Sequence, residues 1–74
     1  MSRLPVISGK DAVRAFEKAG WQKVRFIKNH YQLVKLNRQE HLSIPDHKEL
    51  DRGLLRSEIR IAGLTVNQFT ALLD

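Results

Sequence analysis

Residues 21–36 read WQKVRFIKNHYQLVKL, and this stretch decides the fold class. Aromatic and β-branched side chains, which favour strands, are concentrated on both sides of a central Lys-Asn pair. The stretch predicts two strands, residues 21–28 and 30–36, with a turn at Lys28 and Asn29. It therefore predicts a β-hairpin.

A third strand follows the hairpin. Over residues 41–45, Leu42 and Ile44 alternate with His41 and Ser43, so that one face is apolar and the other polar. Strand, turn, strand, turn and strand in close succession indicate a three-stranded antiparallel meander.

Helical patterns flank the meander on both sides. Residues 8–19 and residues 52–62 each place apolar side chains at helical spacing, and Thr65 can cap a short third helix. The order predicts an α+β fold of α-β-β-β-α type with an added C-terminal helix and with its helices on one face of the sheet. This is the architecture of double-stranded-RNA-binding domains, and we expect residues 1–74 to form one domain.

The charge balance indicates a polyanionic partner. The 74 residues carry 13 Lys and Arg against 8 Asp and Glu, and residues 21–38 contain five of the cations with no acid. The same charges are also compatible with a solvated strand face. The absence of cysteine excludes disulfides and thiolate zinc sites and fits a reducing cytoplasm, and no apolar run approaches the roughly 18 residues that a membrane helix needs.

His30 is the first candidate for chemistry, because it follows the turn and lies inside the acid-free stretch. A neutral imidazole can take the proton from a ribose 2′-hydroxyl, and lysine or arginine can stabilise the negative charge on the attacked phosphate. Such a reaction needs no metal. The alternative is a surface histidine that only forms hydrogen bonds in the hairpin. The spacing of the three histidines fits no zinc site.

Other polar residues have two interpretations. His47, just before the second predicted helix, either holds its loop through hydrogen bonds or contacts phosphate. Arg56 lies in a ridge with Arg52 and Arg60 that either contacts phosphates or is a solvated helix face.

The aromatic residues of the hairpin also have two interpretations. Trp21, Phe26 and Tyr31 can stack on bases, but a domain this small must bury most of its large apolar side chains, so we expect all three in the core.

Several short segments resemble, in order, those of the HicA family of bacterial and archaeal toxins. The segments are LPVISGK at 4–10, KAGW at 18–21, IPDHKEL at 44–50, GLLR at 53–56 and AGLT at 62–65. The resemblance extends over essentially the whole chain. It implies a double-stranded-RNA-binding-like fold and an mRNA interferase, a ribosome-independent endoribonuclease that arrests translation and growth.

The resemblance also assigns roles to residues. It implies that His30 is the catalytic histidine and that the family's Pro-x-His element corresponds to Pro45 and His47. The family pair before the histidine is commonly Gly-Ser, whereas this chain has Lys28 and Asn29. We expect RNA contacts from Lys28, Asn29, Lys35, His47 and Arg56. Lys28, Lys35 and His47 are each candidates to protonate the leaving 5′-oxygen.

The family further implies a HicB-type antitoxin that covers the active site. We expect a hetero-oligomer with this antitoxin, a monomer when free, mRNA as substrate, a cytoplasmic location, and no cofactor, metal or membrane. The apolar residues of the last helix either close the core or contact the antitoxin. Two alternatives for the whole chain are a non-catalytic RNA-binding module on the same fold and an interaction domain whose basic surface binds an acidic partner.

Overall fold

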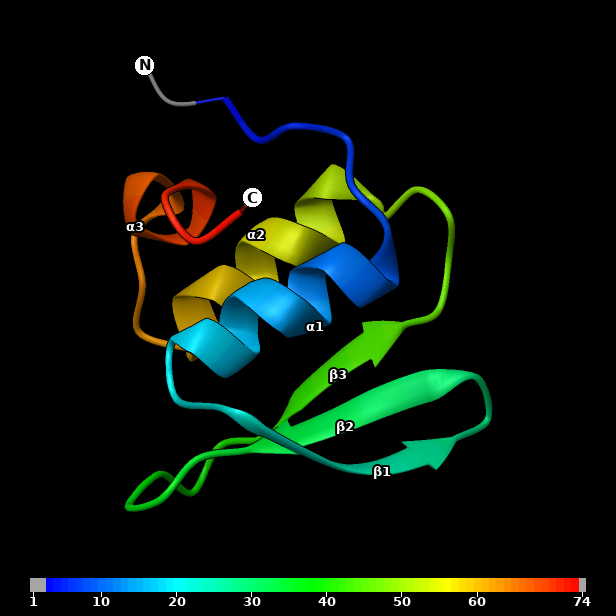
Figure 1. Cartoon of the computed structure of the whole chain (residues 1–74), viewed down its shortest axis with the longest axis vertical. Helices are drawn as coiled ribbons and strands as arrows, with labels where there is room; N and C mark the ends of the chain where they lie inside the picture. The colour runs from blue at the N-terminus through cyan, green and yellow to red at the C-terminus, as the bar shows by residue number, and fades with distance from the viewer. Residues whose placement is uncertain (1–2, 74) are drawn as a thin grey trace.

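The computed structural model describes residues 3–73 and contains every element that the sequence predicts (Figure 1). The elements are α1 (Gly9–Lys18), β1 (Gln22–Ile27), β2 (His30–Val34), β3 (Leu42–Pro45), α2 (Arg52–Ile61) and α3 (Val66–Thr70). The three strands form one antiparallel sheet in the order β1-β2-β3. Helices α1 and α2 lie on the same side of this sheet (Figure 1), which confirms the predicted α+β fold of double-stranded-RNA-binding type.

Side-chain caps explain where the helices begin. Ser8 Oγ accepts the backbone N–H of Asp11 at 3.0 Å, and a carboxylate oxygen of Asp51 accepts that of Leu54 at 2.9 Å. Each cap satisfies an N–H group that has no partner within its own helix. Thr65 begins α3 in the same way, as part of a capping box.

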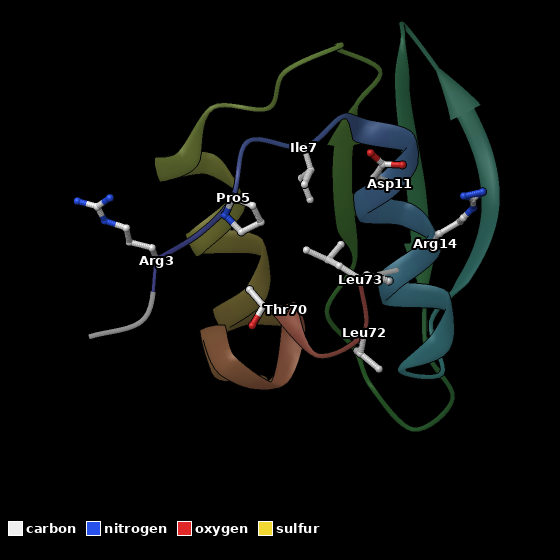
Figure 2. A pocket seen from close by; sticks show the side chains of 9 residues that line it. Arg3, Pro5, Ile7, Asp11, Arg14, Thr70, Leu72 and Leu73 are labelled. Atoms are coloured by element: carbon white, nitrogen blue, oxygen red, sulfur yellow. The ribbon is translucent and has the colours of Figure 1, made fainter.

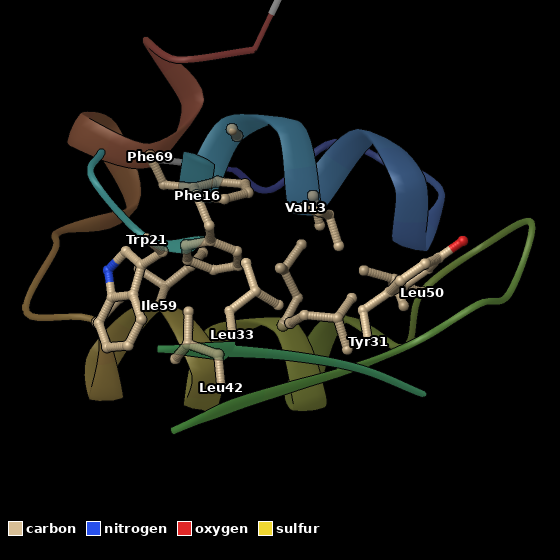
Figure 3. Close-up of a cluster of buried hydrophobic side chains, with 14 of the residues drawn as sticks. Val13, Phe16, Trp21, Tyr31, Leu33, Leu42, Leu50, Ile59 and Phe69 are labelled. Atoms are coloured by element: carbon tan, nitrogen blue, oxygen red, sulfur yellow. The ribbon is translucent and has the colours of Figure 1, made fainter. Parts of the chain in front are cut away.

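The core is a single apolar layer between the helices and the sheet (Figure 3). Leu33, Leu42 and Ile44 contribute to it from β2 and β3, and all three are fully buried. Phe69 of α3 is also fully buried, and its ring centroid lies 4.9 Å from that of Phe16. Helix α3 therefore closes the core.

Strand β1 lies outside this layer, since all six of its residues are exposed. The prediction that the three hairpin aromatics belong to the core is confirmed for Trp21 and Tyr31 but is wrong for Phe26. Phe26 is 52% exposed, and it packs against Tyr31 with 4.8 Å between the ring centroids. The cause is that β1 is an edge strand whose Phe26 side chain the helices leave uncovered.

Two cations of the acid-free stretch bind the C-terminal ends of the helices. Lys35 Nζ donates to the carbonyl of Ala19, which caps α1, at 2.9 Å. The Arg38 guanidinium donates to the carbonyl of Ala62, which caps α2, and lies 5.6 Å from the centre of the Trp21 ring. Cations stabilise the carbonyl end of a helix, so both residues have a structural role.

Candidate active site at the hairpin turn

His30 is the first residue of the central strand and pairs with Ile27 on one side and Pro45 on the other. The next residue, Tyr31, faces the helices, so His30 faces the helix-free side of the sheet. The ring is half-buried, and its Nδ1 lies 3.0 Å from the carbonyl oxygen of Lys28. A carbonyl only accepts hydrogen bonds, so Nδ1 carries the proton. In the neutral ring this leaves the lone pair on Nε2.

The conformation of the turn orients the Lys28 carbonyl toward the His30 ring. Lys28 and Asn29 have φ angles of 51° and 67°, the left-handed pair that defines a type I′ turn. Asn29 also accepts the backbone N–H of Asp46 through its carbonyl, at 2.9 Å. The turn before His30 is therefore bonded to the loop that follows β3.

That loop is held from a second direction by the segment that leads into α1. The N–H of Gly9 donates to the carbonyl of His47 at 2.9 Å, and the N–H of Leu50 donates to that of Ile7 at 2.8 Å. Gly9 is buried, and a Cβ atom at this position would clash with the carbonyl oxygen of Pro45. The backbone of His47 is thus fixed while its side chain remains exposed.

Tyr31 lies beneath this junction. Burial raises the pKa of the Tyr31 hydroxyl, and the neighbouring Asp46 carboxylate raises it further by its charge and by a hydrogen bond. Tyr31 therefore stays protonated near neutral pH, and it connects the core to the loop rather than serving as an acid or base.

The structure brings four of the six predicted site residues to one end of the sheet. Lys28, Asn29 and His30 are consecutive, and His47 lies two residues beyond Pro45, the cross-strand partner of His30. Gly9 and Asp46 were not among the predicted site residues, although their backbone contacts with distant segments position this end. The SG pair at the start of the first predicted helix was the available signal for Gly9.

The other two predicted residues lie elsewhere. Lys35 comes five residues after His30, which is about 17 Å along an extended strand, and its ammonium group binds Ala19. Arg56 is exposed on α2, a helix that packs on β3. Neither residue is in contact with the hairpin turn.

A hollow on another part of the surface lies between the N-terminal segment, α1 and the C-terminal segment (Figure 2). Its lining includes Ile7, Leu72 and Leu73, with Arg14 and Asp11 from α1, and it contains no histidine. Across residues 3–73, no three His, Cys, Asp or Glu side chains come close enough to hold a metal ion. None of the helices in that range is long and apolar enough to cross a membrane.

The fold defines a class of small α+β domains built like double-stranded-RNA-binding domains, here with a histidine beside a basic hairpin turn. Within that class, the model of the HicA toxin of bacterial toxin–antitoxin systems matches residues 9–64, from α1 to the residue before the cap of α3. The chain therefore belongs to the HicA toxin family and is the toxin of such a system. A search of curated proteins finds no match.

Proposed function

We propose that this toxin is an endoribonuclease that cleaves mRNA with His30 as its general base. The observation that carries the proposal is the 3.0 Å contact between His30 Nδ1 and the Lys28 carbonyl, which directs the basic Nε2 away from the turn. A general base needs a defined tautomer and an accessible lone pair; the Nδ1 contact supports the first, and the position of His30 on the helix-free face supports the second.

The reaction follows from this arrangement. Nε2 of His30 takes the proton of a ribose 2′-hydroxyl, and the 2′-oxygen forms a bond to the adjacent phosphorus. The bond from phosphorus to the 5′-oxygen breaks, which leaves a 2′,3′-cyclic phosphate and a 5′-hydroxyl after that oxygen receives a proton. The ammonium group of Lys28, which is one of the two turn residues, stabilises the added charge on the phosphate.

Of the candidates to protonate the 5′-oxygen, His47 and Lys28 fit best, because both belong to the end of the sheet that holds His30. Lys35 fits less well, since its ammonium group already binds the end of α1. We propose RNA contacts from Lys28, Asn29 and His47 at the cleaved nucleotide. Contacts from Lys35 and Arg56 would involve RNA nucleotides farther from the cleaved bond.

The biological setting follows the family. We propose a HicB-type antitoxin that forms a hetero-oligomer with this chain and covers His30, a free toxin that is monomeric, and cleavage of mRNA in the cytoplasm that arrests translation and growth.

A substrate with one modified sugar tests the reaction. A short RNA with a single preferred cleavage position is compared with the same RNA carrying a 2′-deoxyribose at that position. The proposal expects cleavage of the first and at least about a thousandfold slower cleavage of the second, because the nucleophile is missing. Equal cleavage of both would contradict it.

Binding without cleavage would favour the non-catalytic module. In that case both RNAs would bind with the same affinity, the affinity would fall steeply as salt is raised, and neither RNA would be cut. The substitution of Lys28 and Asn29 for the common Gly-Ser pair would then be the first place to look for the cause.

A further inference from the structure

The exposed strand β1 has a composition that RNA cleavage does not explain. Its residues include Val24, Phe26 and Ile27, which are 52%, 52% and 41% exposed. A small domain normally needs its large apolar side chains in the core. Here three of them belong to one edge strand, with Phe26 on the helix face and Ile27 on the opposite face; we call this strand the β1 edge (Gln22–Ile27). Exposed apolar side chains concentrated on one edge strand mark a candidate interaction surface.

The backbone of the β1 edge is also available for pairing. Ile27 and His30 close a two-residue turn and form a hydrogen-bonded pair, so the next pair, Phe26 and Tyr31, is not hydrogen-bonded. The N–H and C=O of Phe26 therefore point away from β2. In the part of the chain that the structure describes, no hydrogen bond from another segment reaches them.

The opposite edge of the sheet differs in this respect. Ser43 of β3 donates its outward N–H to a carboxylate oxygen of Glu58 on α2, at 2.8 Å. Helices α1 and α2 contact β1 and β3 respectively, but all six residues of β1 remain exposed whereas most of β3 is buried. One edge is thus closed by a helix side chain, and the other is open to an additional strand.

Charge decides what kind of strand can add there. Lys23, Arg25 and Lys28 flank the apolar residues, and residues 18–39 contain no Asp or Glu. A second copy of this chain would bring cations opposite cations, which is unfavourable. Lys23 lies over the Tyr31 ring, 5.3 Å from its centre, on the helix face of the sheet. Arg25 and Lys28 are the cations available to an acidic partner.

We propose that the β1 edge binds an extended segment of a protein partner, in which acidic and apolar side chains alternate, as a fourth strand of the sheet. The backbone of Phe26 would pair with that segment. The exposed Phe26 ring would pack against the segment's apolar side chains on the helix face, and Arg25 would bind an acidic side chain on the helix-free face. RNA fits this edge less well, because it offers no strand backbone to pair with the N–H and C=O of Phe26.

The position of this edge connects it to the site, and this part rests on the proposed function. Ile27 of β1 is the direct cross-strand partner of His30. An added strand would lie two strand spacings, about 10 Å, from β2. Arg25 and His30 share the helix-free face, so a long partner side chain on that face reaches over Ile27 toward the His30 ring. Strand addition would therefore restrict the access of RNA to Nε2.

Two blocked octapeptides of alternating residues test the inference, one of glutamate and valine and one of lysine and valine. Amide chemical shifts and hydrogen exchange are measured on the isotopically labelled full chain. The glutamate peptide is expected to shift the β1 amides and to slow exchange at the Phe26 amide at least about tenfold when saturating. The lysine peptide is expected to leave both unchanged.

Two charge reversals locate the contact. Arg25→Glu is expected to weaken binding of the glutamate peptide about tenfold or more. Arg60→Glu, which makes the same change on an exposed position of α2, is expected to leave binding as it was. If Arg25→Glu does not fold, the comparison of the two peptides on the unaltered chain carries the test alone.

Several outcomes would overturn the inference. These are protection of the Phe26 amide by a uridine octanucleotide but not by the glutamate peptide, concentration-dependent self-association with protection of β1, and peptide-induced shifts confined to the hollow of Figure 2. His30→Ala separates this test from that of the proposed function. The His30→Ala variant should still bind the glutamate peptide. If the unaltered chain binds the peptide but does not cleave RNA, that result contradicts only the proposed function.

Discussion

The ring of His30 bonds to the backbone carbonyl of Lys28 rather than to a side chain, with 3.0 Å between Nδ1 and the oxygen. No side-chain substitution at position 28 removes this acceptor, provided that the turn keeps its conformation. This explains how Lys28 can replace the glycine common in the family without loss of the orientation of the histidine. What the site needs from position 28 is a positive φ angle, which this chain adopts with a lysine.

The first prediction concerns the stability of the turn. A residue other than glycine pays roughly 1–2 kcal/mol in the left-handed region, whereas glycine loses about 0.5–1 kcal/mol in chain entropy on folding. Because Lys28 has a φ of 51°, the unaltered chain should be slightly less stable than the Lys28→Gly variant. Lys28→Val should be the least stable of the three, because a β-branched side chain is the least tolerant of positive φ. Thermal unfolding should rank them Gly, Lys, Val, and equal midpoints would contradict the assigned turn.

The second prediction concerns the close approach of α1 to the loop after β3. Gly9→Ala would force a Cβ atom against the carbonyl of Pro45, which is backbone and has little freedom to move. We expect a loss of about 1–3 kcal/mol in unfolding free energy. Gly53→Ala is the matched control, because the nearest atom there is a side-chain oxygen of Asp51 at 3.2 Å. A midpoint for Gly9→Ala at or above that of the control would show that the approach is looser than described.

The third prediction concerns the structural role of Arg38. Arg38→Ala removes the hydrogen bonds to the end of α2, the stacking on Trp21 and the ion pair with Glu40, whose atoms are 2.9 Å apart. We expect a loss of about 1–3 kcal/mol in denaturant unfolding. Arg38→Lys should recover only a small part, since one ammonium cannot reproduce the planar fork. If Arg38→Lys recovered the full unfolding free energy, the positive charge alone would account for the contribution of Arg38, and the prediction would be wrong.

The fourth prediction is a pH dependence. Burial raises the pKa of the Glu58 carboxyl above its ordinary 4.5, and the hydrogen bond from Ser43 opposes this only in part. Because the folded chain holds this proton more tightly than the unfolded chain, the stabilisation is complete below the ordinary pKa. It is lost as the pH rises through the higher pKa of the folded state. Glu58→Gln should therefore gain stability relative to the unaltered chain as the pH rises above the ordinary pKa of 4.5.

Glu40→Gln is the control for this pH dependence. The hydrogen bond and charge of Arg38 lower the pKa of Glu40, so its contribution is present above the ordinary pKa and is lost as the pH falls. The two substitutions should change the dependence of the unfolding midpoint on pH in opposite directions. A Glu58→Gln profile parallel to that of the unaltered chain would refute the assignment.

Much of the fold could be predicted from local sequence signals. The helix caps at Ser8, Asp51 and Thr65 and the turn at Lys28 and Asn29 depend on contacts between residues close in the chain. Such contacts leave a signature in the sequence itself, which is why the elements and their order were correct.

The distribution of the cations could not be predicted in this way. Lys35 binds a carbonyl 16 residues earlier, and Arg38 binds one 24 residues later, so neither partner is visible from local charge. The exposure of Phe26 likewise depends on how far the helices extend across the sheet. His30 and His47 could be named as candidates from the sequence, but only the fold places them at one end of the sheet and Lys35 away from it.

The measurement that tests the central claim most directly is RNA cleavage by the purified chain beside His30→Ala and His41→Ala. His41 is exposed before β3, so its substitution is the matched control. We predict that the unaltered chain and His41→Ala cleave a single-stranded RNA. We predict that His30→Ala cleaves at least about a hundredfold more slowly, as expected for loss of a general base, while it keeps its thermal midpoint and RNA affinity. Cleavage by folded His30→Ala at the unaltered rate would contradict the account.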